Sequence, residues 1–443
     1  MRFIADEPIS NSSEDLFQFS QFVDLIESAV RATEAPFVYG VLGDWGTGKT
    51  SVLRLLEARF RDERGAIRRF PDGKEIFVPI WFDAWKYENE AHIVYPLLYA
   101  IKQQYERDVP RDRKDAIKAA FQTVVATSLL AVGQVGLRAL LKNLTGGAVD
   151  PRLLEESLKQ VREAQESTLN EVDAVLSGWT DSVSNFASAF SELLSTYATE
   201  LVGRADAHRV RFLILVDDLD RCLPETTIGI LESIKHHLSV PNCIFVLAIN
   251  GRVIYQTIRR KYGGEGVDGR EYLEKILNYA FYVPEIDLDK SAMERFVHHQ
   301  REKLVGDRHK RAFDQLSEAL TECKFNNPRR IKRILNRYVI YLERFAADQE
   351  FLPNAIRLML IAEYFPTLFQ LYMRRRADAP PAIKDLLEGK TPVHEFEQVH
   401  GVSVAQLLPQ MRHMQQLFVE LRAPNAEVLN AQIRQIFEIT RLF

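Results

Sequence analysis

The chain has 443 residues, of which 46% are hydrophobic and 27% are charged, and it carries a net charge of −4. This composition predicts a soluble globular protein of two or three domains, and it excludes an overall field that would favour nucleic acid or anionic lipid. The net charge does not exclude local patches of positive or negative charge. Three scattered cysteines without a C-x-x-C pair argue against a disulfide framework or a zinc site.

The first predicted element is a buried strand from Phe37 to Leu42, which runs into a glycine-rich loop and then a helix. The loop and helix start read GDWGTGKT, residues 43–50, and fit the Walker A pattern G-x-x-x-x-G-K-[ST]. The glycines allow consecutive N–H groups to turn inward, and together with the helix N-terminus these groups form a cavity for anionic oxygens. The alternative is a glycine turn that only joins a strand to a helix.

This pattern assigns a role to each polar residue at the loop end. Lys49 is predicted to reach the β and γ phosphates as a mobile point charge, and the Thr50 hydroxyl is predicted to ligate magnesium. The residues predicted to bind the nucleotide are Gly43, Asp44, Trp45, Gly46, Thr47, Gly48, Lys49, Thr50, Ser51 and Asn250.

A second strand is predicted in KEIFVPIWFDAWKYE, ending near Asp83 and Trp85. We expect the tryptophans here to pack in the core rather than to contact a ligand. From residue 88 to about 203 the pattern is mostly helical. Within it, residues 155–176 have a charged face and predict either a projecting helical hairpin that binds a partner or a solvated helix.

One uncharged segment, Ala119–Leu137, is nearly long enough to cross a bilayer. Its five glutamine, threonine and serine residues make it a poor membrane span. A single crossing would also separate the glycine loop from the acidic strand end described next. We therefore expect a buried or partner-facing helix.

The stretch RFLILVDDLDRCLP, residues 211–224, supplies the acids that a phosphate loop requires. Its apolar run predicts a strand buried on both faces of a parallel sheet, and ligands bind at the carboxyl ends of such strands. Asp217 is the candidate metal ligand, directly or through water, and Asp218 is the candidate for polarising the attacking water. The alternative is a polar strand end with capping aspartates.

A third strand, CIFVLAIN, ends in Asn250, which either senses the γ phosphate or is a simple turn residue. Farther on, Arg329 and Arg330 open a helix, and a helical lid of this kind often brings an arginine to the γ phosphate. Arg221 is a second candidate for the arginine that contacts the γ phosphate, either in the same chain or across a subunit boundary. The alternative is that Arg221 forms an ion pair with a nearby aspartate. The basic residues between 324 and 337 also permit contact with nucleic acid phosphates, or they face water.

Five stretches, in this order, resemble the KAP-type P-loop NTPases, a family within the broad class that includes the additional-strand ATPases. They are GDWGTGKTS, WFDAWKYE, LVDDLDRCLP, YLEKILNYAFYVPEI and NNPRRIKRILNRY, and the resemblance extends from about Ala5 to Tyr341. It implies ATP hydrolysis with magnesium in a conformational switch. Bacterial members are often linked with defence against phage.

The chain departs from the family pattern at two places. Many members carry membrane-spanning helices between the two nucleotide motifs, whereas here that hairpin is missing or reduced to Ala119–Leu137. The strand ending in Asn250 more often ends in aspartate in the family, which makes the role of Asn250 less secure.

The predicted fold is α/β: a P-loop NTPase with a mostly parallel sheet flanked by helices, a helical insertion and a C-terminal helical region. The expected divisions are 1–87 and 206–290 for the two parts of the nucleotide domain, 88–205 for the insertion, 291–345 for a helical lid and 346–443 for a C-terminal helical domain. The cofactors expected are ATP and Mg²⁺. GTP is disfavoured because no N-K-x-D stretch is present to read guanine.

The leading functional hypothesis is an ATP-hydrolysing switch of a multi-protein bacterial system, with antiviral defence as the process. The alternative is a nucleotide-dependent scaffold with little turnover that assembles partner proteins. A homo-oligomer is left open, and a membrane partner is not expected. The first residues are too acidic and polar for a secretory signal, which with the cysteine pattern favours the cytoplasm.

Overall fold

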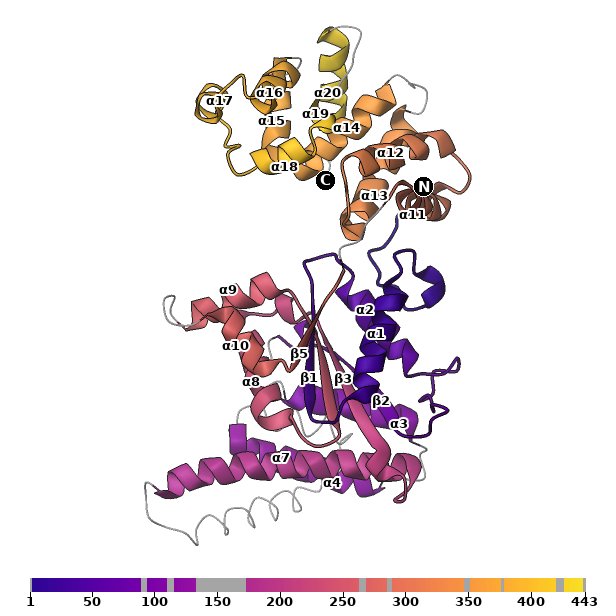
Figure 1. Ribbon diagram of the computed structural model, residues 1–443, viewed down its shortest axis with the longest axis vertical. Coiled ribbons are helices and arrows are strands. Elements are labelled where there is room, and N and C mark those ends of the chain that lie inside the picture. The colour runs from indigo at the N-terminus through magenta and orange to yellow at the C-terminus, as the bar shows by residue number, and fades with distance from the viewer. Residues whose placement is uncertain are drawn as a thin grey trace. The chain divides into compact units, whose positions relative to one another are not determined.

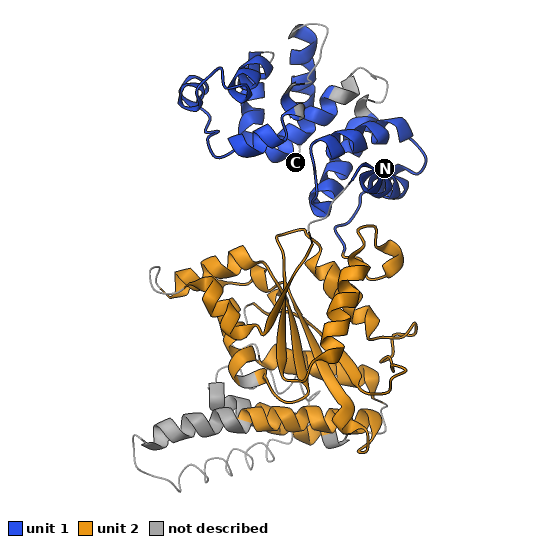
Figure 2. Ribbon diagram, in the orientation of Figure 1, with its two compact units in different colours: residues 1–7, 285–443 blue, residues 8–284 orange. Residues whose placement is uncertain are grey.

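The computed structural model describes residues 2–88, 94–109, 115–132, 173–262, 268–284, 289–345, 351–375, 378–419 and 426–440. The chain divides into two compact units (Figure 2). One unit consists of residues 8–284, and the other combines residues 1–7 with residues 285–443. Most of the predicted hairpin at 155–176 lies outside the described residues.

The first unit, residues 8–284, is built on a five-stranded sheet in which every pairing is parallel. The strand order across the sheet is β2-β3-β4-β1-β5. The strands are β1 Phe37–Leu42, β2 Ile76–Asp83, β3 Val210–Asp217, β4 Cys243–Ile249 and β5 Tyr279–Tyr282. This arrangement confirms the predicted fold class, and β4 lies between the strand before the glycine loop and the strand that ends in Asp217.

The central strands form here because their side chains are apolar on both faces. Every residue of β4 is buried, as are all residues of β3 except Arg211. Strands with this pattern suit the interior of a parallel sheet that is covered on both sides. The register then aligns the strand ends: Leu42 pairs with Ile249, and Asp83 pairs with Asp217. The carboxyl ends of β1, β2, β3 and β4 therefore meet along one edge of the sheet.

Helices cover both faces of this sheet (Figure 1). Helices α1 and α2 lie on one face, and α8, α9 and α10 lie on the other. Their bounds are α1 Phe19–Ala32, α2 Lys49–Arg59, α8 Pro224–Ser233, α9 Gly251–Lys261 and α10 Gly269–Ile276. The buried apolar residues of α2 pack under β3 and β4, so the start of this helix is fixed beside the strand ends.

In the insertion between β2 and β3, the described residues include the helices α3 Val94–Asp108, α4 Asp115–Val132 and α7 Asp173–Val202. Helices α4 and α7 pack along each other (Figure 1), and their buried side chains join the same apolar core as Val78, Ile80 and Phe212 of the sheet. Among the residues described, no helix combines the length and the apolar character that crossing a membrane demands.

The second unit is helical, apart from residues 2–7 at its N-terminal end. Its helices are α11 Lys290–Val305, α12 Lys310–Glu322, α13 Pro328–Phe345, α14 Phe351–Tyr364, α15 Pro366–Arg375, α16 Ala379–Leu387, α17 Val393–His400, α18 Leu408–His413, α19 Gln416–Val419 and α20 Ala426–Thr440. The N-terminal segment is fastened to α13, because the Asn336 side chain exchanges two hydrogen bonds with the backbone of Ile4 at 2.7 and 2.8 Å.

Candidate nucleotide-binding site

The glycine loop links β1 to α2, and its shape depends on two of its glycines. Gly46 and Gly48 have φ angles of +80° and +95°, a region that side-chain-bearing residues rarely adopt. A Cβ atom at Gly48 would also lie 2.6 Å from Cζ of Phe19, the first residue of α1. The loop is held at its start by the Gly43 amide, which donates to the Ile249 carbonyl at 3.1 Å.

Lys49 begins α2, and its ammonium group lies within the loop. Its Nζ donates to the carbonyl oxygens of Gly43 at 2.9 Å and Asp44 at 3.1 Å. Only 8% of the residue is exposed. The positive charge therefore lies among the backbone groups of the predicted phosphate cradle, beside first-turn amides that have no carbonyl acceptor within the helix.

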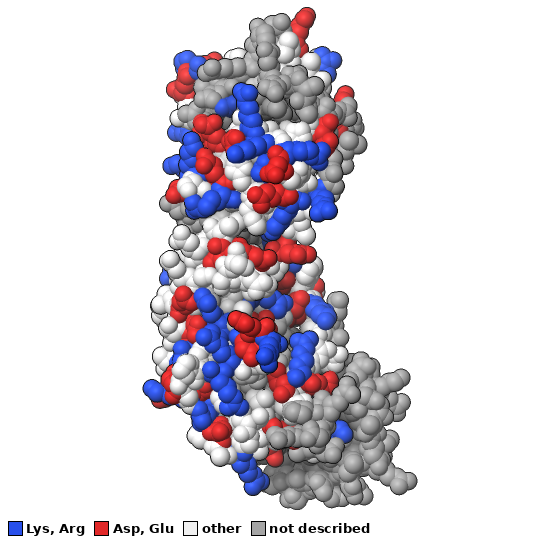
Figure 3. Space-filling model, turned by 90° about the vertical axis from the view of Figure 1, so that its right-hand side faces the viewer, with Lys and Arg blue, Asp and Glu red and all other residues white. Residues whose placement is uncertain are grey.

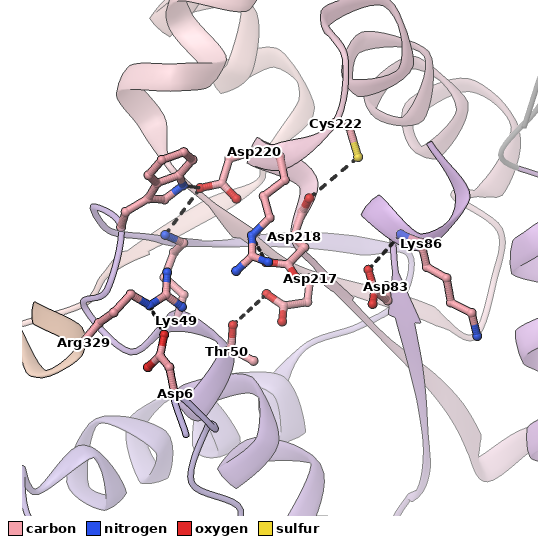
Figure 4. A network of polar contacts seen from close by, with 12 residues as sticks. Asp6, Lys49, Thr50, Asp83, Lys86, Asp217, Asp218, Asp220, Cys222 and Arg329 are labelled. Atoms are coloured by element: carbon pink, nitrogen blue, oxygen red, sulfur yellow. Dashed lines mark hydrogen bonds and ion pairs between the residues drawn. The ribbon is translucent and has the colours of Figure 1, made fainter. Parts of the chain in front are cut away.

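Thr50 and Asp217 come from distant parts of the sequence and meet at the carboxyl edge of the sheet (Figure 4). The Thr50 hydroxyl lies 3.3 Å from Oδ1 of Asp217. Asp217 is buried, and this burial raises the pKa of its carboxyl, which the nearby Asp83 and Asp220 raise further. Crowded, desolvated carboxylates of this kind are stabilised by a cation.

Asp218 follows Asp217 in a left-handed backbone conformation with φ of +55°. Burial and the neighbouring Asp217 raise the pKa of the Asp218 carboxyl to about 6. Its Oδ1 accepts from Nε of Arg221 at 2.9 Å, which is the ion pair that the sequence left open for this arginine. A carboxyl with a pKa near neutrality is suited to exchange a proton at the site.

Asp220 is a member of this site that the sequence analysis did not assign. It is buried, and its Oδ2 accepts from Nε1 of Trp45 at 2.9 Å and lies 3.6 Å from Nζ of Lys49. This carboxylate therefore joins the glycine loop to the short helix Leu219–Arg221. The signal available was the third acid of the DDLDR motif, which has no counterpart in a generic phosphate-loop pattern.

Asn250 follows the last residue of β4 and precedes α9. It is 6% exposed, and its Oδ1 has no hydrogen-bond partner among the described residues. A buried amide oxygen without a partner costs free energy, so its presence needs an explanation such as an ordered water or a bound group. Nearby, Asp44 of the loop faces Arg252 of α9 at 3.7 Å, a pair that is open to solvent.

Thr47 of the loop and Ser51 of α2 form hydrogen bonds with backbone groups. Thr47 donates its hydroxyl back to the Asp44 carbonyl at 2.8 Å, which tightens the loop. The Ser51 hydroxyl, one residue after Thr50, accepts from the Ile9 amide at 3.3 Å. Both residues thus shape the loop and the first helical turn in this structure.

The expectation that the tryptophans near Asp83 pack in the core is wrong for Trp85, which is 48% exposed. The guanidinium of Arg221 lies over its ring at 5.1 Å. Trp81 is partly buried and lies under the guanidinium of Arg54. The sequence pattern misled because Trp85 comes after the strand end, where a chain leaves the sheet and its side chains no longer alternate between two covered faces.

The predicted lid arginines belong to the helical unit. Arg329 forms an ion pair with Asp6, and the Arg330 guanidinium lies 5.0 Å from the ring of Tyr364. Other basic side chains of α13 are also engaged, because Arg337 pairs with Glu363 and Lys332 donates to the Glu7 carbonyl. These side chains have partners within their own unit.

The residues at the sheet edge fit a nucleotide with magnesium in the chemistry of their donors. Thr50 and Asp217 offer hard oxygen ligands, and Mg²⁺ in phosphate sites uses one or two carboxylates with phosphate oxygens and water. In the described part of the chain, no cluster of three or more histidine, cysteine or acidic side chains is arranged to hold a metal alone. The orphaned Asn250 oxygen also favours a ligand at this edge.

Two known proteins have similarity to this chain. Among curated proteins, the phage T7 exclusion protein of Escherichia coli (strain K12) is 21% identical over 282 residues, covering 63% of this chain and 34% of that protein. The chain thus spans about a third of the length of that relative. The solved structure of the Aeropyrum pernix ORC2 protein in its ADPNP-ADP complexes aligns over 99% of this chain and 88% of that one, with a TM-score of 0.37 and 13% identity.

The model of the KAP family P-loop domain matches residues 18–344, which is more than half of the chain. This match includes the glycine loop, the acidic strand end and the basic α13, and it confirms the resemblance found in the motifs. The chain therefore belongs to the KAP family of P-loop NTPases.

Proposed function

We propose that this protein binds ATP with Mg²⁺ and hydrolyses it, and that the nucleotide state switches its interaction with other proteins of a bacterial antiviral system. One observation carries the proposal: Thr50 and Asp217 lie 3.3 Å apart although 167 positions separate them in the sequence. Lys49 begins the same helix as Thr50 and directs its ammonium into the loop. The ammonium, hydroxyl and carboxylate groups that magnesium-dependent ATP hydrolysis would require therefore lie at the same edge of the sheet.

Each residue has a distinct role in this proposal. Lys49 would exchange its bonds to loop carbonyls and Asp220 for the β and γ phosphates, and Thr50 and Asp217 would hold the magnesium shell. Asp218 would orient the attacking water and accept its proton, and Asn250 would orient the γ phosphate or the water. Bound Mg²⁺ supplies positive charge between the phosphate oxygens. Arg329 or Arg330 would approach the γ phosphate only after leaving its present partner.

Phosphate release from ATP, measured with Mg²⁺ and with excess EDTA, tests the proposal. We expect turnover only with the metal. Asp218→Asn should bind ATP normally and turn it over slowly, because the amide keeps the shape but accepts no proton. Normal turnover by Asp218→Asn would show that the assignment of Asp218 is wrong. Glu225→Gln, which neutralises an exposed acid in the first turn of α8, is the matched control and should leave turnover unchanged.

A second candidate is a nucleotide-dependent scaffold with little turnover. The engagement of Arg329 by Asp6 and of Arg330 by Tyr364 favours it, since neither arginine is free for catalysis in this structure. The two candidates differ in their response to a non-hydrolysable ATP analogue. A scaffold would assemble fully and act fully with the analogue, whereas a switch would assemble and then fail to cycle. Mass measurement of the assembly with each nucleotide distinguishes them.

The process and the partners rest on the family and on one relative. The E. coli relative is named as a phage exclusion protein, and its greater length means that its activity belongs to a larger protein. For this chain we propose antiviral defence together with other proteins of the same system. The three cysteines are unbridged, which fits a reducing compartment such as the bacterial cytoplasm. Loss of phage protection in cells that carry Lys49→Ala would support this assignment, and unchanged protection would contradict it.

A further inference from the structure

A cavity lies at the amino-terminal edge of the sheet, opposite the candidate nucleotide-binding site. It is beside the first residue of the edge strand β2. Its volume is about 520 Å³, within the range of about 300–1,000 Å³ typical of small-molecule sites. It is bounded by the end of α2 and the loop after it, by the start of β2, and by the ends of α3 and α7. The charged residues in its lining are Glu57, Arg61, Arg64, Arg69, Arg107 and Asp108.

The lining, here called the arginine pocket, has an excess of positive charge. Its four arginines face two acids, and the acids are already engaged. Glu57 bonds to Arg54 at 2.9 Å and lies 3.5 Å from Arg61. Arg64, Arg69 and Arg107 are exposed, and none of the three forms an ion pair or hydrogen bond through its guanidinium with another described residue. Three arginines of the lining are therefore available to an anion.

The loop that presents Arg61 and Arg64 has a fixed shape. Arg61 and Ile67 form an antiparallel bridge, and the Asp62 carboxylate accepts from the amides of Arg64 and Ala66 at 2.9 Å each. Arg61 also donates to the carbonyls of Gly65 and Pro79 at 3.1 Å each. A loop ordered in this way loses little conformational entropy when a ligand binds.

The remaining lining indicates the rest of the ligand. Apolar side chains of Ile67, Ile76 and Leu201 form part of the wall. Asp108 accepts from Gln104 and from the Tyr197 hydroxyl at 2.7 Å each, and a carboxylate has further lone pairs for hydroxyl or amino groups. Guanidinium groups recognise phosphate through paired N–H donors. A ligand with phosphate at one end and an apolar body with donors at the other would satisfy the lining.

From these features we propose that the arginine pocket binds a phosphorylated small molecule of nucleotide size. The charges beside the lining favour a small ligand over a polymer, because Asp62 and Glu63 stand next to Arg61 and Arg64 in the sequence and Glu106 stands next to Arg107. Basic and acidic side chains are likewise interspersed over the face of the molecule shown in Figure 3. A nucleic acid strand would need a continuous basic track beyond the cavity. The proposal does not depend on ATP hydrolysis at the other edge, although α2 connects the two sites.

The test uses the full chain with Lys49→Ala, which removes phosphate binding at the glycine loop. AMP and inorganic pyrophosphate are titrated separately by calorimetry. We expect saturable binding of at least one of them at one site per chain. Arg64→Ala and Arg107→Ala should each weaken it about tenfold, as expected for loss of a hydrogen bond to a charged group. Arg260→Ala, an exposed arginine on α9, is the matched control and should change nothing.

Three results would overturn the proposal. The first is no saturable binding of either probe, and the second is equal weakening by Arg260→Ala. The third is much tighter binding of a 5′-phosphorylated oligonucleotide that is lost with Arg64→Ala, which would assign the pocket to nucleic acid.

A measurement on the unmodified chain covers the case in which Lys49→Ala fails to fold. Hydrogen exchange with and without AMP reports on the amides of residues 61–67. Because these amides belong to the loop that would contact the phosphate, we expect slower exchange with AMP. Unchanged exchange in this segment at saturating AMP would contradict the proposal independently of the calorimetry.

Discussion

The two edges of the parallel sheet differ in the burial and pairing of their charged side chains. At the carboxyl edge, Lys49, Asp217 and Asp220 are buried: Lys49 donates to the backbone and pairs with Asp220, and Asp217 accepts from the Thr50 hydroxyl. At the amino edge, Arg64 and Arg107 are exposed and form no ion pair within the described part of the chain. The first arrangement is costly to disturb, because breaking a buried pair leaves an uncompensated charge. The second has no internal bond to lose.

Because of this difference, a ligand should bind at the two edges in different ways. A ligand at the carboxyl edge must replace existing bonds of Lys49, so binding there is an exchange. A ligand at the amino edge only adds bonds to a loop that is already ordered. If the two edges differ in this way, substitutions at the carboxyl edge should change turnover or the free energy of unfolding much more than substitutions at the amino edge.

Removing the buried cation should have the largest effect. We expect Lys49→Ala to lower ATP turnover at least about hundredfold, as for loss of a preorganised group that stabilises transition-state charge. Phosphate release at saturating ATP and Mg²⁺ measures it, with circular dichroism to verify folding. Turnover within a few-fold of the unmodified chain would remove Lys49 from the chemistry.

The buried acid that the sequence analysis missed provides a stability test of the same edge. Asp220→Ala should lower the free energy of unfolding by about 3 kcal/mol, because the buried Lys49 loses its carboxylate partner and the exposed Trp45 loses its hydrogen-bond acceptor. Asp220→Asn, which retains an oxygen acceptor for Trp45, should cost less. Urea unfolding of the two variants measures the loss of free energy of unfolding. An equal loss in both would contradict the role of Asp220 as the hydrogen-bond acceptor of Trp45.

The glycine loop makes a steric prediction. Gly48→Ala should destabilise the chain by about 2 kcal/mol, because alanine is strained at a φ of +95° and its Cβ would meet Phe19. Gly65→Ala also has positive φ but no atom within 4 Å of its Cβ, so it isolates the backbone strain. If thermal unfolding shows the same loss for both, the Phe19 contact contributes nothing.

The acids at the carboxyl edge should make stability depend on pH. The pKa of Asp218 is raised from 3.8 to about 6 in the folded protein, so between these values the folded state holds the proton that the unfolded state has released. This contribution to stability is present below pH 4 and is lost as the pH rises through about 6. Without nucleotide or metal, Asp218→Asn should therefore gain stability relative to the unmodified chain over this range. A constant difference between the two proteins from pH 4 to 7 would exclude the raised pKa.

The smallest effect is expected at the amino edge. Arg64→Ala should change the free energy of unfolding by less than about 0.5 kcal/mol, because its guanidinium is exposed and bonds to no other residue that the structure describes. Urea unfolding measures this. A loss comparable to that of Asp220→Ala would mean that the two edges do not differ as described.

The carboxyl edge was largely predictable, because its chemistry is concentrated in short motifs. A glycine loop followed by Lys49, and an apolar run ending in two acids, each carry their meaning within about ten residues. The hydrophobic pattern also indicated the strands that bring them together, since a parallel sheet aligns strand ends at one edge. The short edge strand β5 was not recognised, because only one of its four residues is buried.

The features that were missed depend on contacts between distant segments. The approach of Phe19 to Gly48 and the bond from Trp45 to Asp220 join residues that no local pattern relates. The arginine pocket combines a loop with the ends of three helices, so its arginines read individually as ordinary surface charges. Exposure of Trp85 was misjudged for the same reason, because burial is decided by what covers a residue after the chain has folded.

The attachment of Ile4 to Asn336 has a consequence for how the chain is made. These partners are 332 positions apart, so the segment around Ile4 acquires its place only after α13 has been synthesised. Closing so long a loop is slow and entropically unfavourable unless the intervening residues are already compact. We therefore expect the sheet unit to form first during translation and the helical unit to be completed last.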